Sequence, residues 1–236
     1  TNAAFNSLAV GEHDDFLIPV TVTDNNGGTS TTNIEVHITG TNDKAVISST
    51  MVSVTEDTHQ TETIQLTITD ADAGEAHFDD SKAILGTHGD ASISATGELI
   101  YTVHNASKAV QELNVGESIT DTLTVKSADG TSHDVSVTIH GTNDNPVIQA
   151  IAEKFVDEGG TEVKGTITSI DADKGDTATY ATSSTQAGFK LNADGSYSLD
   201  PLDPSFEKLA VNESQKIVIA VVATDSHSGV SVSSDL

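Results

Sequence analysis

Apolar and polar residues alternate in short runs along the whole chain, and clusters of Gly, Asn, Asp and Ser separate these runs. A period of two predicts half-buried β-strands, because successive side chains of a strand point to opposite faces. About seven such runs per hundred residues predict an all-β fold of tandem immunoglobulin-like sandwiches with Greek-key connections, and no segment predicts a helix. The clearest runs are Ile64, Leu66 and Ile68; Leu123 and Val125; Val135, Val137 and Ile139; and Ile217, Ile219 and Val221.

Acidic, amide-rich turns recur at a fixed interval. "GTNDKAVI" at 40–47 returns as "GTNDNPVI" at 141–148, a displacement of 101 residues (141 minus 40). "TDADAGEA" at 69–76 matches "IDADKGDT" at 170–177 with the same displacement. Recurrence of several turns in one order indicates tandem structural repeats rather than chance composition.

A third motif divides the chain into three copies. "LAVGE", "LNVGE" and "LAVNE", which end at Glu12, Glu117 and Glu213, each precede a run that ends in Asp24, Asp129 or Asp225. We therefore expect the C-terminal part of a first repeat at 1–43, a complete repeat at 44–144, and a third repeat at 145–236 that stops near its last strand. On this interpretation the chain is an internal piece of a longer protein.

The charge balance excludes some partners. The chain has 236 residues, of which 36 are acidic and 10 basic, all ten of them Lys, and its formal net charge is −26. Nucleic acid is not an expected partner, because phosphate binding depends on basic side chains. So much carboxylate repels itself unless cations neutralise it. The absence of Cys excludes thiolate metal sites, and no apolar run approaches the roughly 20 residues that insert into a membrane.

These motifs together resemble the VCBS-type repeats of large bacterial RTX-type surface adhesins, whose folds are cadherin-like. "TNDNP" is similar to the cadherin linker, "DAD" to the DxD turn of the following domain, and "LNVGE" to the acidic turn before the sixth strand. The resemblance implies that calcium binds between successive repeats. Lys44 and Ala45 depart from it, since they stand where the second linker has Asn145 and Pro146.

Chain geometry supports the same sites, because an up-and-down count of seven strands brings the linker, the DxD turn and the acidic turns to each junction. Ca²⁺ takes 6–8 oxygen ligands, which such a cluster can supply. At the first junction we expect Glu12, Asn42, Asp43, Asp70, Asp72 and Asp129 as ligands. At the second we expect Glu56, Glu117, Asn143, Asp144, Asp171, Asp173 and Asp225, while Asp157, Glu158 and Glu213 would serve a third.

The same residues also fit other kinds of site less well. A single "DAD" or "TND" can be an ordinary turn, because Asx side chains cap their own backbone. The nine His show no H-E-x-x-H spacing, and His37 and His140 fall on solvent-facing strand positions, which favours exposed strand residues over a zinc site. No G-x-S-x-G motif is present, and carboxylates that recur in each copy suit a junction better than one glycosidase site. Tyr101, Tyr180 and Tyr197 are expected in the core or in cross-strand pairs.

The sequence thus predicts a non-enzymatic, monomeric extender segment of a secreted adhesin at the bacterial cell surface. Calcium and neighbouring repeats of the same chain are its expected partners, and projection of distal modules for attachment or biofilm formation is its expected role. The alternative is a module that itself recognises a peptide or glycan on another cell. An enzyme is the least favoured class.

Overall fold

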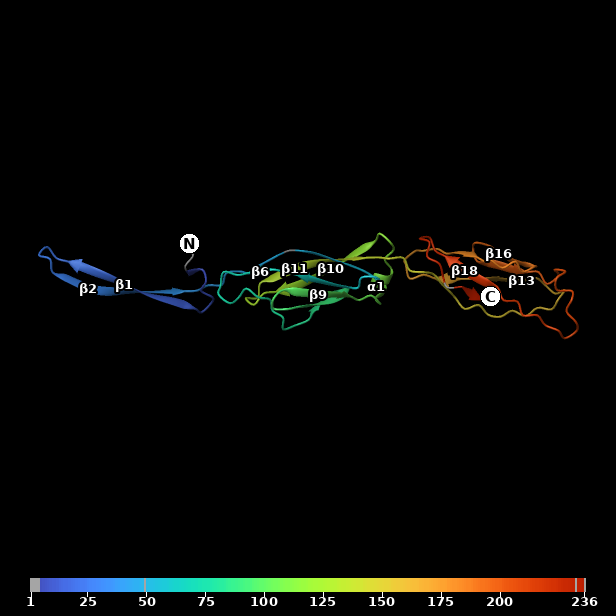
Figure 1. The fold of residues 1–236 in the computed structure, drawn as a ribbon, viewed down its shortest axis with the longest axis horizontal. Helices are drawn as coiled ribbons and strands as arrows, with labels where there is room; N and C mark the ends of the chain where they lie inside the picture. Colours follow the sequence, from blue (N-terminus) through green and yellow to red (C-terminus); the bar gives the residue numbers. More distant parts are fainter. Residues whose placement is uncertain (1–4, 49, 232, 236) are drawn as a thin grey trace. The chain divides into compact units, whose positions relative to one another are not determined.

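The structure is a computed structural model that describes residues 5–48, 50–231 and 233–235 (Figure 1). The chain separates into two compact units. The first contains the described residues up to Val54 together with Thr58–His104 and Ile119–Ile139. The second contains Thr55–Asp57, Asn105–Ser118 and the described residues from His140 onward.

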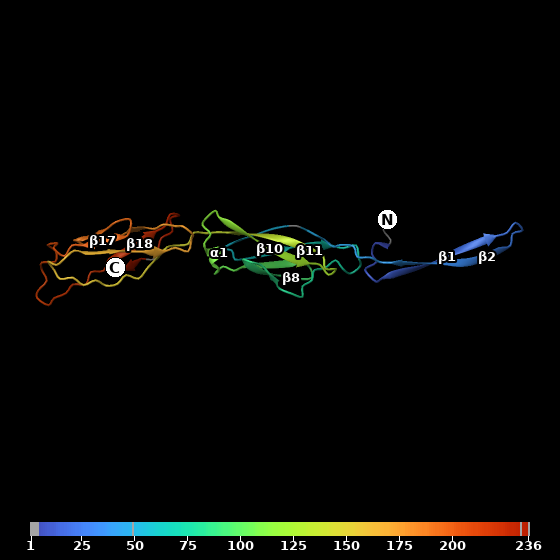
Figure 2. The same ribbon diagram turned by 180° about the vertical axis from the view of Figure 1, so that it is seen from behind.

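A long hairpin opens the first unit. Strands β1 (His13–Thr23) and β2 (Thr29–Thr39) pair antiparallel over their full length, from His13 opposite Thr39 to Thr23 opposite Thr29. Figure 2 shows them from behind as a two-stranded ribbon. The hairpin exposes apolar side chains such as Ile18 and Ile34, although these alternate as the sequence predicts.

Two sheets follow, and their strands pair out of chain order. One sheet has the order β10-β11-β4 and the other the order β5-β9-β8-β7, while β3 pairs with β6. The strands are β3 (Val46–Ile47), β4 (Met51–Thr55), β5 (Thr61–Gln65), β6 (Ile68–Thr69), β7 (Ile84–Leu85), β8 (Gly89–Ile93), β9 (Glu98–Val103), β10 (Ser118–Lys126) and β11 (Ser132–His140).

The core of this part lies between alternating faces of the two sheets. Leu123 on β10 and Val137 and Ile139 on β11 are fully buried, as the period-two pattern predicts. Tyr101 on β9 donates a hydrogen bond of 3.1 Å from its hydroxyl to Asp121 on β10, and both residues are buried. The two sheets therefore face each other across a packed interior, as the layers of a β-sandwich do.

The second unit has shorter strands around a smaller core. They form sheets of the order β12-β14, β13-β17-β16 and β15-β18-β19. Ile167, Tyr197, Ile219 and Val221 are its buried core, and Tyr180 packs against them. The strands are β12 (Val147–Ile148), β13 (Val163–Thr166), β14 (Ser169–Ile170), β15 (Thr179–Ala181), β16 (Phe189–Leu191), β17 (Ser196–Leu199), β18 (Ala220–Thr224) and β19 (Ser234–Asp235).

The sequence-based expectations need three corrections. A four-residue helix, α1 (Lys108–Gln111), was not predicted; it buries Val110, and one turn is too short to show a period of 3.6. Strand β18 begins only at Ala220, so Ile217 and Ile219 lie before it. The run Ile64, Leu66 and Ile68 is divided between β5 and β6, and Leu66 lies between these two strands. Among the described residues, no helix has the length and apolar character needed to cross a membrane.

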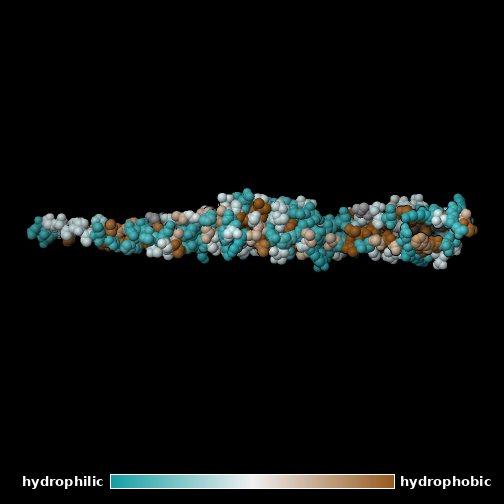
Figure 3. Space-filling view, turned by 90° about the horizontal axis from the view of Figure 1, so that it is seen from below, coloured by the Kyte–Doolittle hydropathy of each residue, from teal (hydrophilic) through white to brown (hydrophobic). Residues whose placement is uncertain are grey.

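The predicted fold class is confirmed: the described chain is almost entirely β, with sandwiches in tandem. Hydrophilic residues predominate on the face drawn in Figure 3, with hydrophobic groups between them. The predicted tyrosines Tyr101 and Tyr197 are buried, and Tyr180 is partly buried. Loops at the ends of the short strands carry most of the acidic motifs, and these loops form the candidate site.

Candidate metal centre

Two Asp-x-Asp turns have the same local structure. Asp70 and Asp72 directly follow β6, and Asp171 and Asp173 directly follow β14. In each turn the second Asp donates its backbone N–H to Oδ1 of the first, at 2.9 Å in the first turn and 3.0 Å in the second. This Asx arrangement uses one oxygen of the first Asp and fixes both side chains in direction. Asp72 and Asp173 are only 2% and 3% exposed.

Each linker is hydrogen-bonded to its turn in the same way. The backbone N–H of Asp43 donates to Oδ2 of Asp72, and that of Asp144 donates to Oδ2 of Asp173, both at 2.8 Å. The bond orients the second Asp of the turn and leaves its Oδ1 for another partner. Residues 29 positions apart in sequence thus meet identically in both copies.

The linker asparagines join a further acidic turn to each cluster. The Asn143 side-chain amide donates to the backbone carbonyl of the next residue at 2.8 Å and to Asp225 Oδ2 at 3.0 Å. The Asn42 amide does the same, at 3.0 Å and, to Asp129 Oδ2, 3.2 Å. Because both donors are used, the amide oxygen is the group that each asparagine can offer to a cation.

Several buried oxygens in these loops have no hydrogen-bond donor. Buried polar atoms are normally satisfied, and a concentration of acceptor oxygens without donors is an arrangement that a bound cation can satisfy. In the first unit the atoms are Asp70 Oδ2, Asp72 Oδ1 and Glu75 Oε2; in the second they are Asn114 Oδ1, Asn143 Oδ1, Asp144 Oδ2, Asp171 Oδ2 and Asp173 Oδ1. All eight are oxygens, which are the ligands that a hard cation such as Ca²⁺ takes.

Burial and mutual repulsion raise the pKa of the carboxylates at the second cluster. Burial, followed by the charges of Asp144, Asp57 and Asp173, raises the pKa of Glu56 to about 7, although a hydrogen bond from Thr142 opposes the shift. Burial and then the charges of Asp57 and Asp173 raise the pKa of Asp144 to about 6. The cluster is thus unfavourable in its ionised form unless positive charge enters it.

The Asp residues of the two later turns behave differently. Burial opposes ionisation of Asp129 and Asp225, but donated hydrogen bonds outweigh it and lower the pKa of both. Asp129 accepts from the Ser127 hydroxyl and from both the backbone and hydroxyl of Thr131, besides Asn42. These two carboxylates are held ionised by the protein itself and orient the linker asparagines.

In the absence of metal, we expect the second unit to become more stable as the pH falls from 8 to 5. Glu56 has a folded pKa of about 7 against an ordinary 4.5, so the folded state binds a proton more tightly than the unfolded state does. Its ionisation therefore costs stability as the pH rises through that window, by about 3 kcal/mol for a shift of this size. Urea unfolding in EGTA at the two pH values measures this. Glu56→Gln should reduce the slope but not abolish it, because Asp144, with a folded pKa of about 6, titrates in the same window. An equal slope in the variant would contradict the assignment to Glu56.

Sequence reasoning missed four residues of the clusters. Asp57 lies beside Asp144 and accepts hydrogen bonds from Asn105 (2.6 Å) and Gln111 (3.3 Å). Glu75 and Asp176 occupy the same place in the two "DAD" turns, 101 residues apart, and this recurrence could have revealed them. Carboxylate oxygens of Asp171, Asp173 and Asp176 lie within 4.8 Å of one another. The fourth is Asn114, whose oxygen gave no signal in the sequence.

The glutamates of the L-x-V-x-E turns, Glu12 and Glu117, are exposed, as is Asn42 of the predicted set. Glu12 Oε2 accepts from the backbone N–H of Ala9 at 3.1 Å, and Glu117 Oε2 accepts from that of Asn114 at 3.2 Å. One oxygen of each therefore stabilises its own turn. Glu12 also lies close enough to Glu75 for its charge to raise the pKa of Glu75. Asp157, Glu158 and Glu213 are exposed.

Each cluster joins loops that are far apart in the sequence. In the second unit, the Thr142 backbone N–H donates to Glu56 Oε1 at 2.8 Å, which joins two loops of the segment 44–144, and the Asn114 amide donates to the carbonyl of Lys174, beyond that segment, at 3.2 Å. In the first unit, Ala73 donates its N–H to the carbonyl of Ser7 at 3.2 Å. The structure therefore brings the linker, the DxD turn and an acidic turn together twice.

Comparison with known proteins finds one matching family model and several similar solved structures. Residues 42–141 match the family model of the bacterial cadherin-like domain, and this segment is a cadherin-like repeat. Among solved structures, human CDH23 EC21-23 is similar at 16% identity and a TM-score of 0.48, over 92% of this chain and 74% of that one. Mouse Cadherin-23 EC22-24 is similar at 19% identity and a TM-score of 0.49, over 94% and 72%. No curated protein matches the chain.

Proposed function

We propose that this chain is a calcium-stiffened extender segment of a secreted bacterial adhesin of the VCBS or RTX type. Within it, the repeats divide at 43/44 and 144/145, and calcium binds at the two clusters. One observation carries the proposal: at both linkers, buried carboxylate oxygens without donors lie in the DxD turn to which the linker backbone is hydrogen-bonded. At the second linker these oxygens include two amide oxygens and come from both sides of the division at 144/145. A cation bound there would connect the repeats on either side of each linker.

The donor chemistry favours calcium. The second cluster offers the carboxylates of Glu56, Asp57, Asp144, Asp171, Asp173 and Asp176 and the amide oxygens of Asn114 and Asn143. Ca²⁺ accepts 6–8 oxygens in irregular geometry, whereas Mg²⁺ requires a tight octahedron and keeps its water. The repeated Asx turns would supply these oxygens without rearrangement of the backbone.

A mechanical role follows from where the ions would bind. Without them, repulsion between the carboxylates of a cluster opposes close approach of the loops that carry them. With them, the linker and the loops of two repeats become one coordination sphere. The chain would then act as a spacer that projects distal binding modules from the cell surface, with no catalytic role and with neighbouring repeats as its protein partners.

Small-angle scattering across a calcium titration tests the proposal. We expect the distribution of interatomic distances to narrow as calcium is added, because the linkers lose conformational freedom, and to broaden again with EGTA. A distribution that is the same with and without calcium would contradict the spacer role. Binding of the chain to a glycan or peptide array, unaffected by changes at the clusters, would instead favour a ligand-recognition module.

A further inference from the structure

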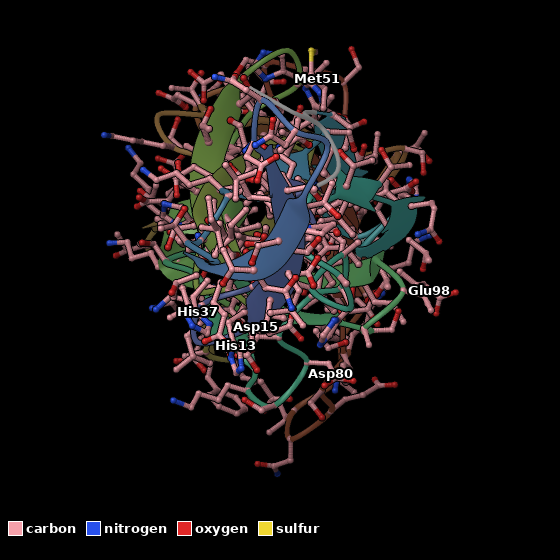
Figure 4. The ribbon with its side chains drawn as sticks, turned by 90° about the vertical axis from the view of Figure 1, so that its left-hand side faces the viewer. His13, Asp15, His37, Met51, Asp80 and Glu98 are labelled. Carbon is pink, nitrogen blue, oxygen red and sulfur yellow. The ribbon has the colours of Figure 1, made fainter. Side chains whose placement is uncertain are left out.

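The outer face of the β1–β2 hairpin carries a group of metal-ligating side chains separate from the calcium clusters. Asp15 on β1 lies directly opposite His37 on β2, and His13 lies two residues from Asp15 on the same strand. Positions two apart on a strand share a face, as do directly paired residues. Figure 4 shows His13, Asp15 and His37 together on one side of the hairpin.

The Asp15 carboxylate lies between the two imidazoles and presents one oxygen to each. His37 Nδ1 is 2.6 Å from Asp15 Oδ1, and His13 Nε2 is 3.9 Å from Asp15 Oδ2. Ligand atoms bound to tetrahedral Zn²⁺ at about 2.0–2.1 Å lie about 3.3 Å from one another. This separation falls between the 2.6 Å and 3.9 Å of the two His–Asp contacts. Taken with one ligand atom each, the three residues do not all lie within 4.8 Å of one another, so the His13 side chain would have to rotate toward Asp15 and His37 to complete the set.

These donors differ in kind from those of the acidic clusters. Two imidazoles and one carboxylate suit Zn²⁺ and related transition metals, whereas Ca²⁺ takes oxygen ligands. We propose that His13, Asp15 and His37 form a Zn²⁺ site on the outer face of the β1–β2 hairpin, with a fourth position open to solvent or to a ligand from another molecule.

The surroundings permit such a site. The side chains of His13 and His37 are each 65% exposed and that of Asp15 is 53% exposed, so they can rotate without disturbing the core. Phe16, adjacent in sequence and thus on the opposite face, packs edge-to-face against Phe5 at 5.3 Å between ring centroids. The net charge of −26 also raises the local concentration of cations.

The middle repeat provides an internal contrast. By the displacements of the repeat motifs, His13 and Asp15 correspond to Ser118 and Thr120, and His37 corresponds to Thr138. Hydroxyl groups at these positions are poor zinc ligands. The site therefore belongs to the first repeat alone, unlike the acidic turns, which recur in every copy. Its ligands come together only through the register of the hairpin, and no local spacing motif describes them.

Calorimetric titration with Zn²⁺ tests the proposal on the full chain, without a polyhistidine tag and with calcium in excess to fill the acidic clusters. We expect wild type to bind one equivalent of Zn²⁺. His13→Gln or His37→Gln should abolish this binding or weaken its affinity by at least roughly 10–100-fold, because loss of an outer-shell partner alone costs that much. His104→Gln is the control, because His104 forms an imidazole–carboxylate ion pair with Asp90 at 2.9 Å outside the hairpin. The His104→Gln variant should still bind one equivalent of Zn²⁺.

A spectroscopic readout separates ligation from an indirect effect. In NMR spectra, the imidazole resonances of His13 and His37 should shift together with the first Zn²⁺ equivalent, and circular dichroism should show unchanged strand content in both variants. Zn²⁺ binding in the His13→Gln/His37→Gln double variant that equals wild type would overturn the site. Imidazole resonances of the hairpin that do not respond to Zn²⁺ would overturn it as well.

Discussion

Removal of calcium with EGTA is expected to lower the melting temperature of the chain by roughly 10 °C, and calcium in excess should restore it. An ion that binds only the folded state at 100 times its dissociation constant contributes about 2.7 kcal/mol, and each kcal/mol moves the melting temperature of a domain of this size by about 4–8 °C. Extracellular modules bind calcium at about 10⁻⁴–10⁻³ M, so millimolar concentrations should suffice.

The comparison must be made at constant ionic strength, because salt alone screens the repulsion of a chain with a net charge of −26. Magnesium at the same concentration is the control and should restore less of the lost stability. Equal melting curves in EGTA and in millimolar calcium would rule out calcium as a structural ligand. Equal rescue by sodium would show that general screening, rather than a bound ion, stabilises the chain.

The effect of the double variant Asp171→Asn with Asp173→Asn on stability is expected to have opposite signs in the presence and in the absence of calcium. In calcium, the double variant should be less stable than wild type, because loss of two charged ligands weakens binding on the order of 100-fold. In EGTA it should be more stable than wild type, because Asp171 Oδ2 and Asp173 Oδ1 are buried without donors and repel their neighbours. Asp171 accepts a backbone N–H through Oδ1 and Asp173 accepts one through Oδ2. Asn keeps one side-chain oxygen that can accept this bond at each position, so the turn itself is retained.

Two ordinary turn-forming aspartates, Asp194 and Asp203, provide a matched control for Asp171 and Asp173. Asp194 and Asp203 accept backbone N–H bonds from Ser196 and Ser205 at 2.9 Å and are outside the clusters. Asp194→Asn with Asp203→Asn removes the same charge and should leave calcium affinity unchanged. If both double variants respond alike to calcium and EGTA, Asp171 and Asp173 only form a turn. The change Asp70→Asn with Asp72→Asn should reproduce the sign reversal in the first unit.

The sequence by itself determined the fold class and most of the candidate ligands. Alternation of Val135, Val137 and Ile139 specifies which face of a strand is buried, because the side-chain period of a strand is local and fixed. The Asx turns of Asp70 and Asp171 are likewise local, since a short acidic side chain caps the backbone two residues later. Repetition at 101 residues then predicted that the linkers are candidate sites rather than isolated turns.

Only the tertiary structure decided which groups complete each cluster. Asp57 and Asn114 lie 87 and 30 residues before Asp144, in the same loops as the predicted Glu56 and Glu117. The other copies of the L-x-V-x-E motif have Ala9 and Ala210 at the position of Asn114, so no recurrence marked its side chain. His37 is a further example. Its solvent-facing strand position predicts an ordinary surface residue, and only the register of the hairpin shows that it lies opposite Asp15. Local sequence patterns determine the strands and turns in which residues lie. Which residues together can bind an ion depends on distances between side chains that only the folded chain sets.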